Sequence, residues 1–319
     1  MALADPIKIG FIGAGRIARV HARTLQTLEG AQPLAWSAQH ASNAAAAARE
    51  FGGVAMATEG LLAHKEIEAI IISTPTHLHA SQVIQAFESE KHVFCEKPIA
   101  RTEAQANEMI AASQKISRTL FVGHTLRFFS IYAKARELLL AGEIGTLRRA
   151  TCRRLNRPQA GWLLDYDKSG GCILDLLIHD FDFLNWCLGT PTRVEVETVP
   201  DKDTSGVRHA IVHLYFATGA KAEVEGSWLH DHFEHSFLWE GDEGRLKFEA
   251  DGLLRLENKR GAHVIETPSD DPYRMQMKNF LQHLHTGSPL LATPEDARAA
   301  LAVALAGLKK LEMKAKTSP

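Results

Sequence analysis

Lys97 is the first residue whose type and place in the sequence could do chemistry. It lies in the stretch HVFCEKP (residues 92–98), after an apolar run and Glu96, and directly before Pro98. The carboxyl ends of parallel strands are where open α/β sheets bind their ligands. An amine that is partly removed from solvent at such an end can take part in proton transfer. A solvated surface turn and a simple ion pair with Glu96 are the two alternatives.

Asp175 and His179 form the second candidate group, in the stretch GGCILDLLIHD (residues 170–180). On a helix, residues four positions apart lie on one face, so both side chains would point the same way. A carboxylate beside an imidazole stabilises the protonated ring, which suits the pair to accepting a proton. A helix cap or a buried structural pair would show the same pattern, and the sequence leaves that alternative open.

About the first 120 residues alternate between short apolar runs and segments with helical spacing. We predict strands at residues 7–15, 32–38, 68–75, 92–98 and 118–124. We predict helices between them at residues 16–28, 42–51, 79–91 and 102–117. Strands that are apolar on both faces and alternate with helices indicate a parallel sheet covered on both sides. The predicted fold class is therefore α/β, beginning with a doubly wound parallel sheet.

The turn from the first strand to the first helix carries a G-x-G-x-x-A motif formed by Gly13, Gly15 and Ala18. Gly13 permits a tight turn, Gly15 lets a pyrophosphate approach the positive end of the helix, and Ala18 keeps helix and strand close. In this strand–turn–helix context the motif predicts a dinucleotide site, with Arg16 and Ile17 as further cofactor contacts. A plain tight turn is the alternative.

The end of the second predicted strand bears on the choice of cofactor. Domains that bind NAD usually carry Asp or Glu there, for the ribose 2′-hydroxyl. This chain has Trp36-Ser37-Ala38-Gln39-His40, without a carboxylate. Ser37, Gln39 or His40 could donate to a 2′-phosphate, although no arginine follows to bind it in a bidentate manner. The sequence thus permits both NAD and NADP and leans slightly towards NADP.

After His124 the alternation stops, so we divide the chain there into a Rossmann domain, residues 1–123, and a second domain, residues 124–319. The second domain is predicted to be α+β with an open, mainly antiparallel sheet, since several extended runs alternate polar and apolar residues. These runs are residues 146–158, 193–199, 209–217, 220–229 and 235–249. Its predicted helices are residues 130–145, 172–189, 273–287 and 293–312.

The composition, the net charge and the cysteine spacing exclude several classes of function. Of the 319 residues, 45% are hydrophobic and the net charge is −2, so nothing indicates nucleic acid or an anionic membrane as a partner. No apolar run is long enough to span a bilayer, and the N-terminus has no signal-peptide pattern. The 4 cysteines form no C-x-x-C pair, which favours the reducing cytoplasm.

Residues 230–235 (HDHFEH) have side chains that can bind metals. They fall at a predicted hairpin turn, where polar residues are expected in any case. His230, His232 and Glu234 would share a face only if the strand continued through them. We therefore predict a solvated turn or a subunit contact, and no metal site.

Taken together, these motifs resemble the glucose–fructose oxidoreductase/inositol dehydrogenase/MocA family. The matching stretches run in order along nearly the whole chain: GFIGAGRIARVH, STPTHLHA, KHVFCEKPIA, RFF, the loop with SGG, D-x-x-x-H-D, GDEGRL and TPEDA. The resemblance implies a Rossmann domain followed by a domain with an open antiparallel sheet. It also implies a homodimer or homotetramer, and an amide bond before Pro98 that is commonly cis.

The resemblance further assigns roles to residues. Lys97, Asp175 and His179 would be catalytic: His179 would take the hydroxyl proton, Lys97 would bind the substrate oxygen and assist, and Asp175 would orient the pair. The nicotinamide would lie against residues of the STPTHLH and EKP stretches: Ser73, Thr74, Pro75, His79, Glu96 and Lys97. Further candidates for substrate contacts are Arg127, Trp162, Asp165 and Tyr273. At Ala38 the chain departs from the NAD-type members, which carry aspartate.

Three functions follow as hypotheses. The first is an NAD(P)-dependent oxidoreductase that acts on the CH–OH group of a sugar, cyclitol or related polyol. The second is a glycosidase-type enzyme whose tightly bound NAD oxidises and re-reduces a sugar while a glycosidic bond is cleaved. The third is a non-catalytic regulatory protein that binds NAD(P), which the intact EKP and D-x-x-x-H motifs disfavour. The loop at residues 156–170 is predicted to carry substrate specificity, with Trp162 and Tyr166 as candidates for stacking on a sugar ring.

Overall fold

The computed structural model describes residues 6–197 and 207–317, and the chain divides into two compact units. The first unit contains the chain up to Phe128 together with Asp270–Arg298. The second unit contains Phe129–Ser269 and the chain from Ala299 onward. A boundary between independent domains near Gly123–His124 remains a prediction.

A six-stranded parallel sheet forms the centre of the first unit, in the order β3-β2-β1-β4-β5-β6. Its strands are β1 Ile7–Ile12, β2 Ala31–Ser37, β3 Val54–Ala55, β4 Ala69–Ile72, β5 His92–Cys95 and β6 Leu120–Val122. The strand order reverses between β1 and β4. In doubly wound sheets that reversal marks the place where ligands bind, outside the carboxyl ends of the strands.

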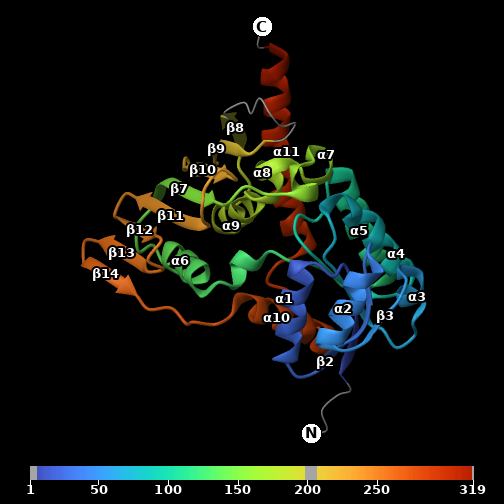
Figure 1. Cartoon of the computed structure of the whole chain (residues 1–319). Coiled ribbons are helices and arrows are strands. Elements are labelled where there is room, and N and C mark those ends of the chain that lie inside the picture. The colour runs from blue at the N-terminus through green and yellow to red at the C-terminus, as the bar shows by residue number, and fades with distance from the viewer. Residues whose placement is uncertain (1–5, 198–206, 318–319) are drawn as a thin grey trace. The chain divides into compact units, whose positions relative to one another are not determined.

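Within the described part of the first unit, six α-helices lie wholly inside it. They are α1 Arg16–Gln26, α2 Ala41–Phe51, α3 Thr58–Ala63, α4 His79–Glu88, α5 Glu103–Ile116 and α10 Pro272–Thr286. The core is rich in aromatic side chains, because Phe11 stacks on Trp36 and Phe94 packs against both Phe121 and Phe280. Phe280 lies on α10, which runs beside α1 (Figure 1). A segment from late in the chain therefore completes the core of the first unit.

An eight-stranded sheet forms the second unit, in the order β14-β13-β12-β11-β7-β10-β9-β8. Its strands are β7 Leu147–Leu155, β8 Arg193–Glu197, β9 His209–Tyr215, β10 Lys221–Ser227, β11 Glu234–Gly241, β12 Gly244–Phe248, β13 Leu254–Asn258 and β14 Gly261–Ile265. Neighbouring strands are antiparallel except for β7 and β10. The α/β class and the mainly antiparallel second sheet are thus confirmed, while the predicted run 193–199 extends past the described residues.

The helices of the second unit are α6 Ser130–Leu140, α7 Tyr166–Ser169, α8 Gly171–Asp175 and α9 Ile178–Leu188. A long helix, α11 Pro294–Thr317, starts in the first unit and continues into the second. Inward-facing side chains of the strands alternate with polar outward-facing ones; on β7, for example, Cys152 is buried and Arg153 is exposed. No helix among the residues 6–197 and 207–317 is long and apolar enough to cross a membrane.

The structure corrects the single helix predicted at residues 172–189. The helix ends at Asp175 and a new one starts at Ile178, with Leu176 and Leu177 between them. The N–H of Leu177 donates to Cys172 O, five residues back, instead of continuing the α-helical pattern. Leu177 is fully buried against Gly226 of β10, where an added Cβ would lie 2.6 Å from the leucine. Packing against the sheet therefore breaks the helix, and Asp175 and His179 are not on one continuous helical face.

Candidate active site

Two glycines in the turn after β1 have different reasons to be glycine. Gly13 has a φ of 107°, and an added Cβ would lie 2.8 Å from the carbonyl oxygen of Ser73. The predicted tight turn is confirmed, and no side chain fits there. Gly15 has an ordinary φ of −77° and ends the turn as the N-cap of α1. Apart from its chain neighbours and the backbone of its own helix, no atom of the described residues lies within 4 Å of a Cβ added to Gly15.

The N-terminus of α1 fits an anionic group. Gly15 provides no side-chain cap, and the first turn of α1 contains no acidic residue. Arg16 is exposed at the first helical position, and Ile17 is half-buried. Free N–H groups and the helix dipole at such an end attract phosphate. Neither packing nor backbone conformation requires glycine at position 15, whereas close approach of a pyrophosphate would.

The end of β2 offers two exposed donors. Ser37 is only 4% exposed, and its hydroxyl lies 2.7 Å from the hydroxyl of Thr58. Gln39 and His40 are exposed. Of the three residues predicted to reach a 2′-phosphate, these two therefore remain accessible without rearrangement of a hydrogen bond.

Lys97 follows β5 and is half-buried, and its bond to Pro98 is cis, as the resemblance implies. The preceding residue, Glu96, is 7% exposed and lies beside His21 of α1, with 2.6 Å between Oε1 and Nε2. The other carboxylate oxygen of Glu96 accepts the backbone N–H of Lys97 at 3.2 Å. Burial raises the pKa of Glu96, but the hydrogen bond and charge of His21 and the charge of Lys97 outweigh it and hold the pKa below its usual range.

His79 connects the segment after β4 with the segment after β5. It is 1% exposed, with Nδ1 at 2.8 Å from Pro98 O and Nε2 at 2.9 Å from Thr74 O. Burial lowers the pKa of His79, while the two carbonyl groups act in the opposite direction. Thr74 donates its hydroxyl to Gln82 at 2.5 Å, and Ser73 and Pro75 on either side are half-buried.

In the second unit, Asp175 and His179 are both half-buried, at the end of α8 and the start of α9. The next residue, Asp180, is buried and forms a bidentate pair with Arg154 of β7, at 2.6 and 3.0 Å. Burial opposes the charge of Arg154, but Asp180 and Tyr132 raise its pKa above the usual value. The two hydrogen bonds from the Arg154 guanidinium to Asp180 therefore fasten the start of α9 to the sheet.

The candidate substrate residues have the following surroundings. Arg127 is buried and donates to Leu291 O and to the Asp296 carboxylate, at 2.9 and 3.0 Å. Asp165 caps α7 and pairs with Lys168 at 2.6 Å, and the Lys168 hydrogen bond lowers its pKa. Trp162 is half-buried in a 3-10 helix at Gly161–Leu164. Tyr273 opens α10 in the first unit, with its ring 6.0 Å from that of His21.

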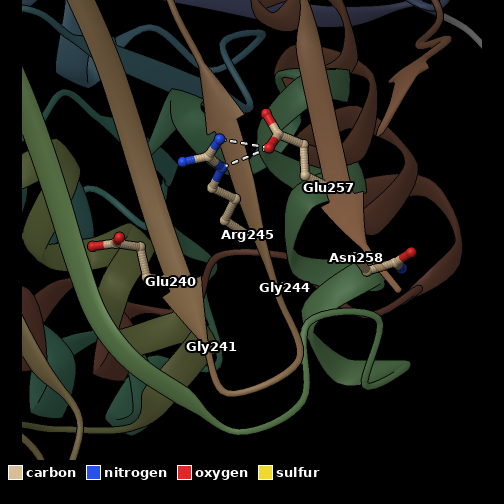
Figure 2. Close-up of a pocket in the computed structure, with 6 residues that line it drawn as sticks. All are labelled: Glu240, Gly241, Gly244, Arg245, Glu257 and Asn258. Atoms are coloured by element: carbon tan, nitrogen blue, oxygen red, sulfur yellow. Dashed lines mark hydrogen bonds and ion pairs between the residues drawn. The ribbon is translucent and has the colours of Figure 1, made fainter. Parts of the chain in front are cut away.

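Two further places carry polar side chains that could meet a ligand. His232 contacts Asp231 and Glu234, but within the described ranges no cluster of His, Cys, Asp or Glu could hold a metal ion. Figure 2 shows an open pocket in the second unit, where Arg245 is paired with Glu257 at 2.6 Å. The pocket is lined by Glu240, Gly241, Gly244, Arg245, Glu257 and Asn258. None of these residues was predicted to act in catalysis or cofactor binding.

Within the first unit, the structure gathers the predicted cofactor residues at the carboxyl ends of neighbouring strands. Gly13 follows β1, Ser73 follows β4, and Lys97 follows β5, and all three strands are adjacent. Sequence reasoning missed His21 and Arg154. His21 had a usable signal, since it falls between Ala18 and Leu25 on the apolar face of α1, where an ionisable residue needs a buried partner. Arg154 also had a signal, since on a strand it shares the face of Ala150 and Cys152, where an ionisable residue needs a buried partner.

Family comparisons agree with this geometry. Residues 7–124 match the model of an oxidoreductase family with an NAD-binding Rossmann fold, and residues 132–247 match its GFO/IDH/MocA C-terminal domain. The chain belongs to this family and is an NAD(P)-dependent oxidoreductase.

Among its relatives is the myo-inositol 2-dehydrogenase of Thermotoga maritima, 28% identical, with 97% of both chains covered. The inositol 2-dehydrogenase of Rhizobium meliloti is 26% identical, covering 98% of this chain and 99% of the relative. A 3-ketoreductase of Actinomadura kijaniata, solved with NADP and TDP-benzene, superposes with a TM-score of 0.89. It is 20% identical over 96% of this chain and 98% of its own, so it supports the fold alone.

Proposed function

We propose that the protein transfers a hydride between a CH–OH group of a sugar, cyclitol or related polyol and a nicotinamide cofactor. The observation that carries this proposal is the half-buried residue Lys97 at the carboxyl end of β5, in the sheet that also carries the glycine turn after β1, in a chain that has the Asp175–His179 pair as well. Full-length relatives that act on inositol support the substrate class.

Three residues have distinct roles in the proposed hydride transfer. His179 takes the hydroxyl proton of the substrate, so that the carbon can release its hydrogen as hydride. Lys97 donates a hydrogen bond to the same oxygen and lowers the cost of the negative charge that develops there. Asp175 orients His179 and balances the charge it gains. The nicotinamide, when bound, accepts the hydride with both electrons.

The cofactor would be held by the turn after β1 and the strand ends beside it. Gly13 and Gly15 would receive the pyrophosphate with Arg16 and Ile17, and Ser73, Thr74 and Pro75 would border the nicotinamide. Because the end of β2 carries no carboxylate and exposes Gln39 and His40, we propose a preference for NADP over NAD.

Turnover of the purified protein with inositols, aldoses and sugar acids tests the proposal, using NAD and NADP in separate assays. The Lys97→Ala variant should lose about 10²–10⁴-fold in kcat, while its affinity for the cofactor changes little. Lys115→Ala, which removes an exposed lysine of α5, is the matched control and should behave like the wild type. Near-normal kcat in Lys97→Ala would refute the mechanism.

Other outcomes separate the alternatives. A cofactor that copurifies and does not exchange, together with cleavage of glycosides and no net nicotinamide reduction, would indicate the glycosidase-type reaction. Release of a protein partner on addition of NADP, without any turnover, would indicate a regulatory function. A kcat/KM that is higher with NAD than with NADP would overturn the proposed cofactor preference.

A further inference from the structure

Lys97 lies between two residues that are each held by a buried histidine. We propose that His21 and His79 are positioning residues that fix Lys97 from its two sides. His21 acts through the carboxylate of Glu96, and His79 acts through the carbonyl group of Pro98. This inference rests on the proposed catalytic role of Lys97.

The first contact passes through a single carboxylate. Glu96 Oε1 lies 2.6 Å from His21 Nε2, and Glu96 Oε2 accepts the Lys97 backbone N–H at 3.2 Å. The carboxylate is therefore shared between a fully buried ring on α1 and the peptide group of Lys97. The His21 ring is itself fixed, since it packs edge-on against Phe94 with 4.8 Å between ring centroids.

The carboxylate of Glu96 has little freedom to move. A Cβ added to Gly123, at the end of β6, would lie 3.2 Å from Oε1 and 3.3 Å from Oε2. The backbone N–H of Glu96 also donates to Ile72 O at 2.9 Å. The enclosed carboxylate of Glu96 thus couples the position of α1 to the position of the Lys97 peptide group.

The second contact holds the residue after Lys97. Pro98 O lies 2.8 Å from His79 Nδ1, and the other ring nitrogen lies 2.9 Å from Thr74 O. His79 thereby connects the two segments that follow β4 and β5. Because both ring nitrogens face carbonyl groups and the residue is 1% exposed, these contacts support a role for His79 in positioning the two segments.

The effect on catalysis follows from the flexibility of lysine. Its side chain has four rotatable bonds, and a shift of the backbone from which it starts displaces the amine as well. A displacement of about 1 Å in a reacting group can lower the rate by about 10²-fold. Loss of either histidine should therefore reduce kcat much more than KM or cofactor affinity.

Four variants test this proposal in the whole protein. His21→Leu and His79→Leu should each lower kcat by about 10–100-fold. His21→Gln, which keeps an N–H donor near the place of Nε2, should recover most of that loss. His92→Gln is the control, because His92 is a partly buried histidine at the other end of β5 that hydrogen-bonds Thr119. It should leave kcat unchanged whatever it does to the melting temperature.

A double variant separates positioning from general structural support. If His21 acts through Lys97, His21→Leu should lower kcat no further in a Lys97→Ala background. An additional loss of similar size in that background would overturn the proposal. A fall in melting temperature with normal kcat in His21→Leu and His79→Leu would do the same.

The rate at which Lys97 is acetylated, measured by mass spectrometry with Lys115 as the internal reference, tests the positioning role without any enzyme activity. The rate of Lys97 labelling should change in His21→Leu and His79→Leu and stay at the wild-type value in His92→Gln. If the wild type turns over no substrate but labelling changes as expected, the positioning role stands and the proposed function fails. Unchanged labelling in both leucine variants would refute the positioning role itself.

Discussion

The segments that carry Lys97 and His179 are held by different kinds of buried contact. In the first unit, Glu96 precedes Lys97 and its carboxylate lies beside an imidazole, that of His21. In the second unit, Asp180 follows His179 and its carboxylate binds a guanidinium, that of Arg154. An acidic neighbour thus fastens each candidate catalytic residue, but the partner of that acid differs.

The difference indicates different tasks. Arg154 and Asp180 form two parallel hydrogen bonds and join α9 to β7, so the pair connects a helix to the sheet on which it packs. The Glu96 carboxylate also accepts the N–H of Lys97, so the pair with His21 fixes the position of one peptide group, that of Lys97. We expect the contact in the second unit to affect chiefly stability and the contact in the first unit to affect chiefly kcat.

The largest effect should come from Arg154→Met, which leaves the Asp180 carboxylate buried without its cation. Breaking such a pair costs about 3–5 kcal/mol, because an uncompensated charge remains inside. Urea denaturation would measure the loss in free energy of unfolding. Arg153→Met is the matched control, since Arg153 is the next residue of β7 and pairs with Glu225 at the surface. Its cost should be about 1 kcal/mol or less.

The double variant Arg154→Met/Asp180→Leu sharpens this prediction. Replacing both members of a buried pair by apolar residues removes the unpaired charge, so stability should return towards the wild-type value. Equal costs for Arg153→Met and Arg154→Met would show that the buried pair has no special role, and the contrast between the two units would fail.

Substitutions at Gly13 and Gly15 should have smaller effects. They test, within the first unit, the same contrast between a residue needed for stability and a residue needed for function. Gly13→Ala should cost about 1–3 kcal/mol, since its φ is positive and its Cβ would meet Ser73. Gly15→Ala should change stability by less than about 0.5 kcal/mol. It should weaken cofactor binding by roughly tenfold or more, about 1.4 kcal/mol, because a methyl group would stand where the pyrophosphate approaches. Calorimetric titration with NADP and thermal unfolding would measure the two effects, and tight binding by Gly15→Ala would refute the site.

Much of the first unit could be predicted from sequence because its signals are local. The apolar strands, the glycine motif and the helices between them depend on neighbours in the chain, and the structure confirms them. The catalytic candidates were likewise visible as motifs. The contacts that hold these motifs were not, since His21 and Glu96 are 75 residues apart and Arg154 and Asp180 are 26 apart.

Tertiary packing also explains the errors. Leu177 breaks the predicted helix because β10 offers it Gly226, which no pattern around Leu177 reveals. The helix α10 was predicted as a helix, but its place beside α1 depends on Phe280 meeting Phe94 across the sequence. The strands β13 and β14 were not predicted at all. On β13 the alternation of Leu254 and Leu256 with polar residues was overlooked, and β14 has no such alternation and exposes its first four positions.

The smallest expected effect concerns His235, a titratable residue whose pKa depends in part on Arg154 and Asp180. Burial and then the positive charge of Arg154 lower the pKa of His235 to about 4, and Asp180 only partly opposes this. In the unfolded chain the same ring titrates near its ordinary value of about 6.5. Between pH 6.5 and about 4 the unfolded state therefore binds more protons, and stability falls as the pH falls through that window. Above pH 6.5 this contribution is constant.

His235→Asn removes the titrating ring and keeps an acceptor for the Tyr132 hydroxyl, which lies 2.8 Å from His235 Nδ1. The variant should lose stability less steeply than the wild type between pH 6.5 and 4, by at most about 1.4 kcal/mol per pH unit. His263→Asn, at an exposed position of β14, is the control and should follow the wild-type curve. Urea denaturation at a series of pH values would measure the slopes. Identical slopes for His235→Asn and the wild type would mean that burial and the guanidinium of Arg154 do not lower the pKa of His235 in the folded protein.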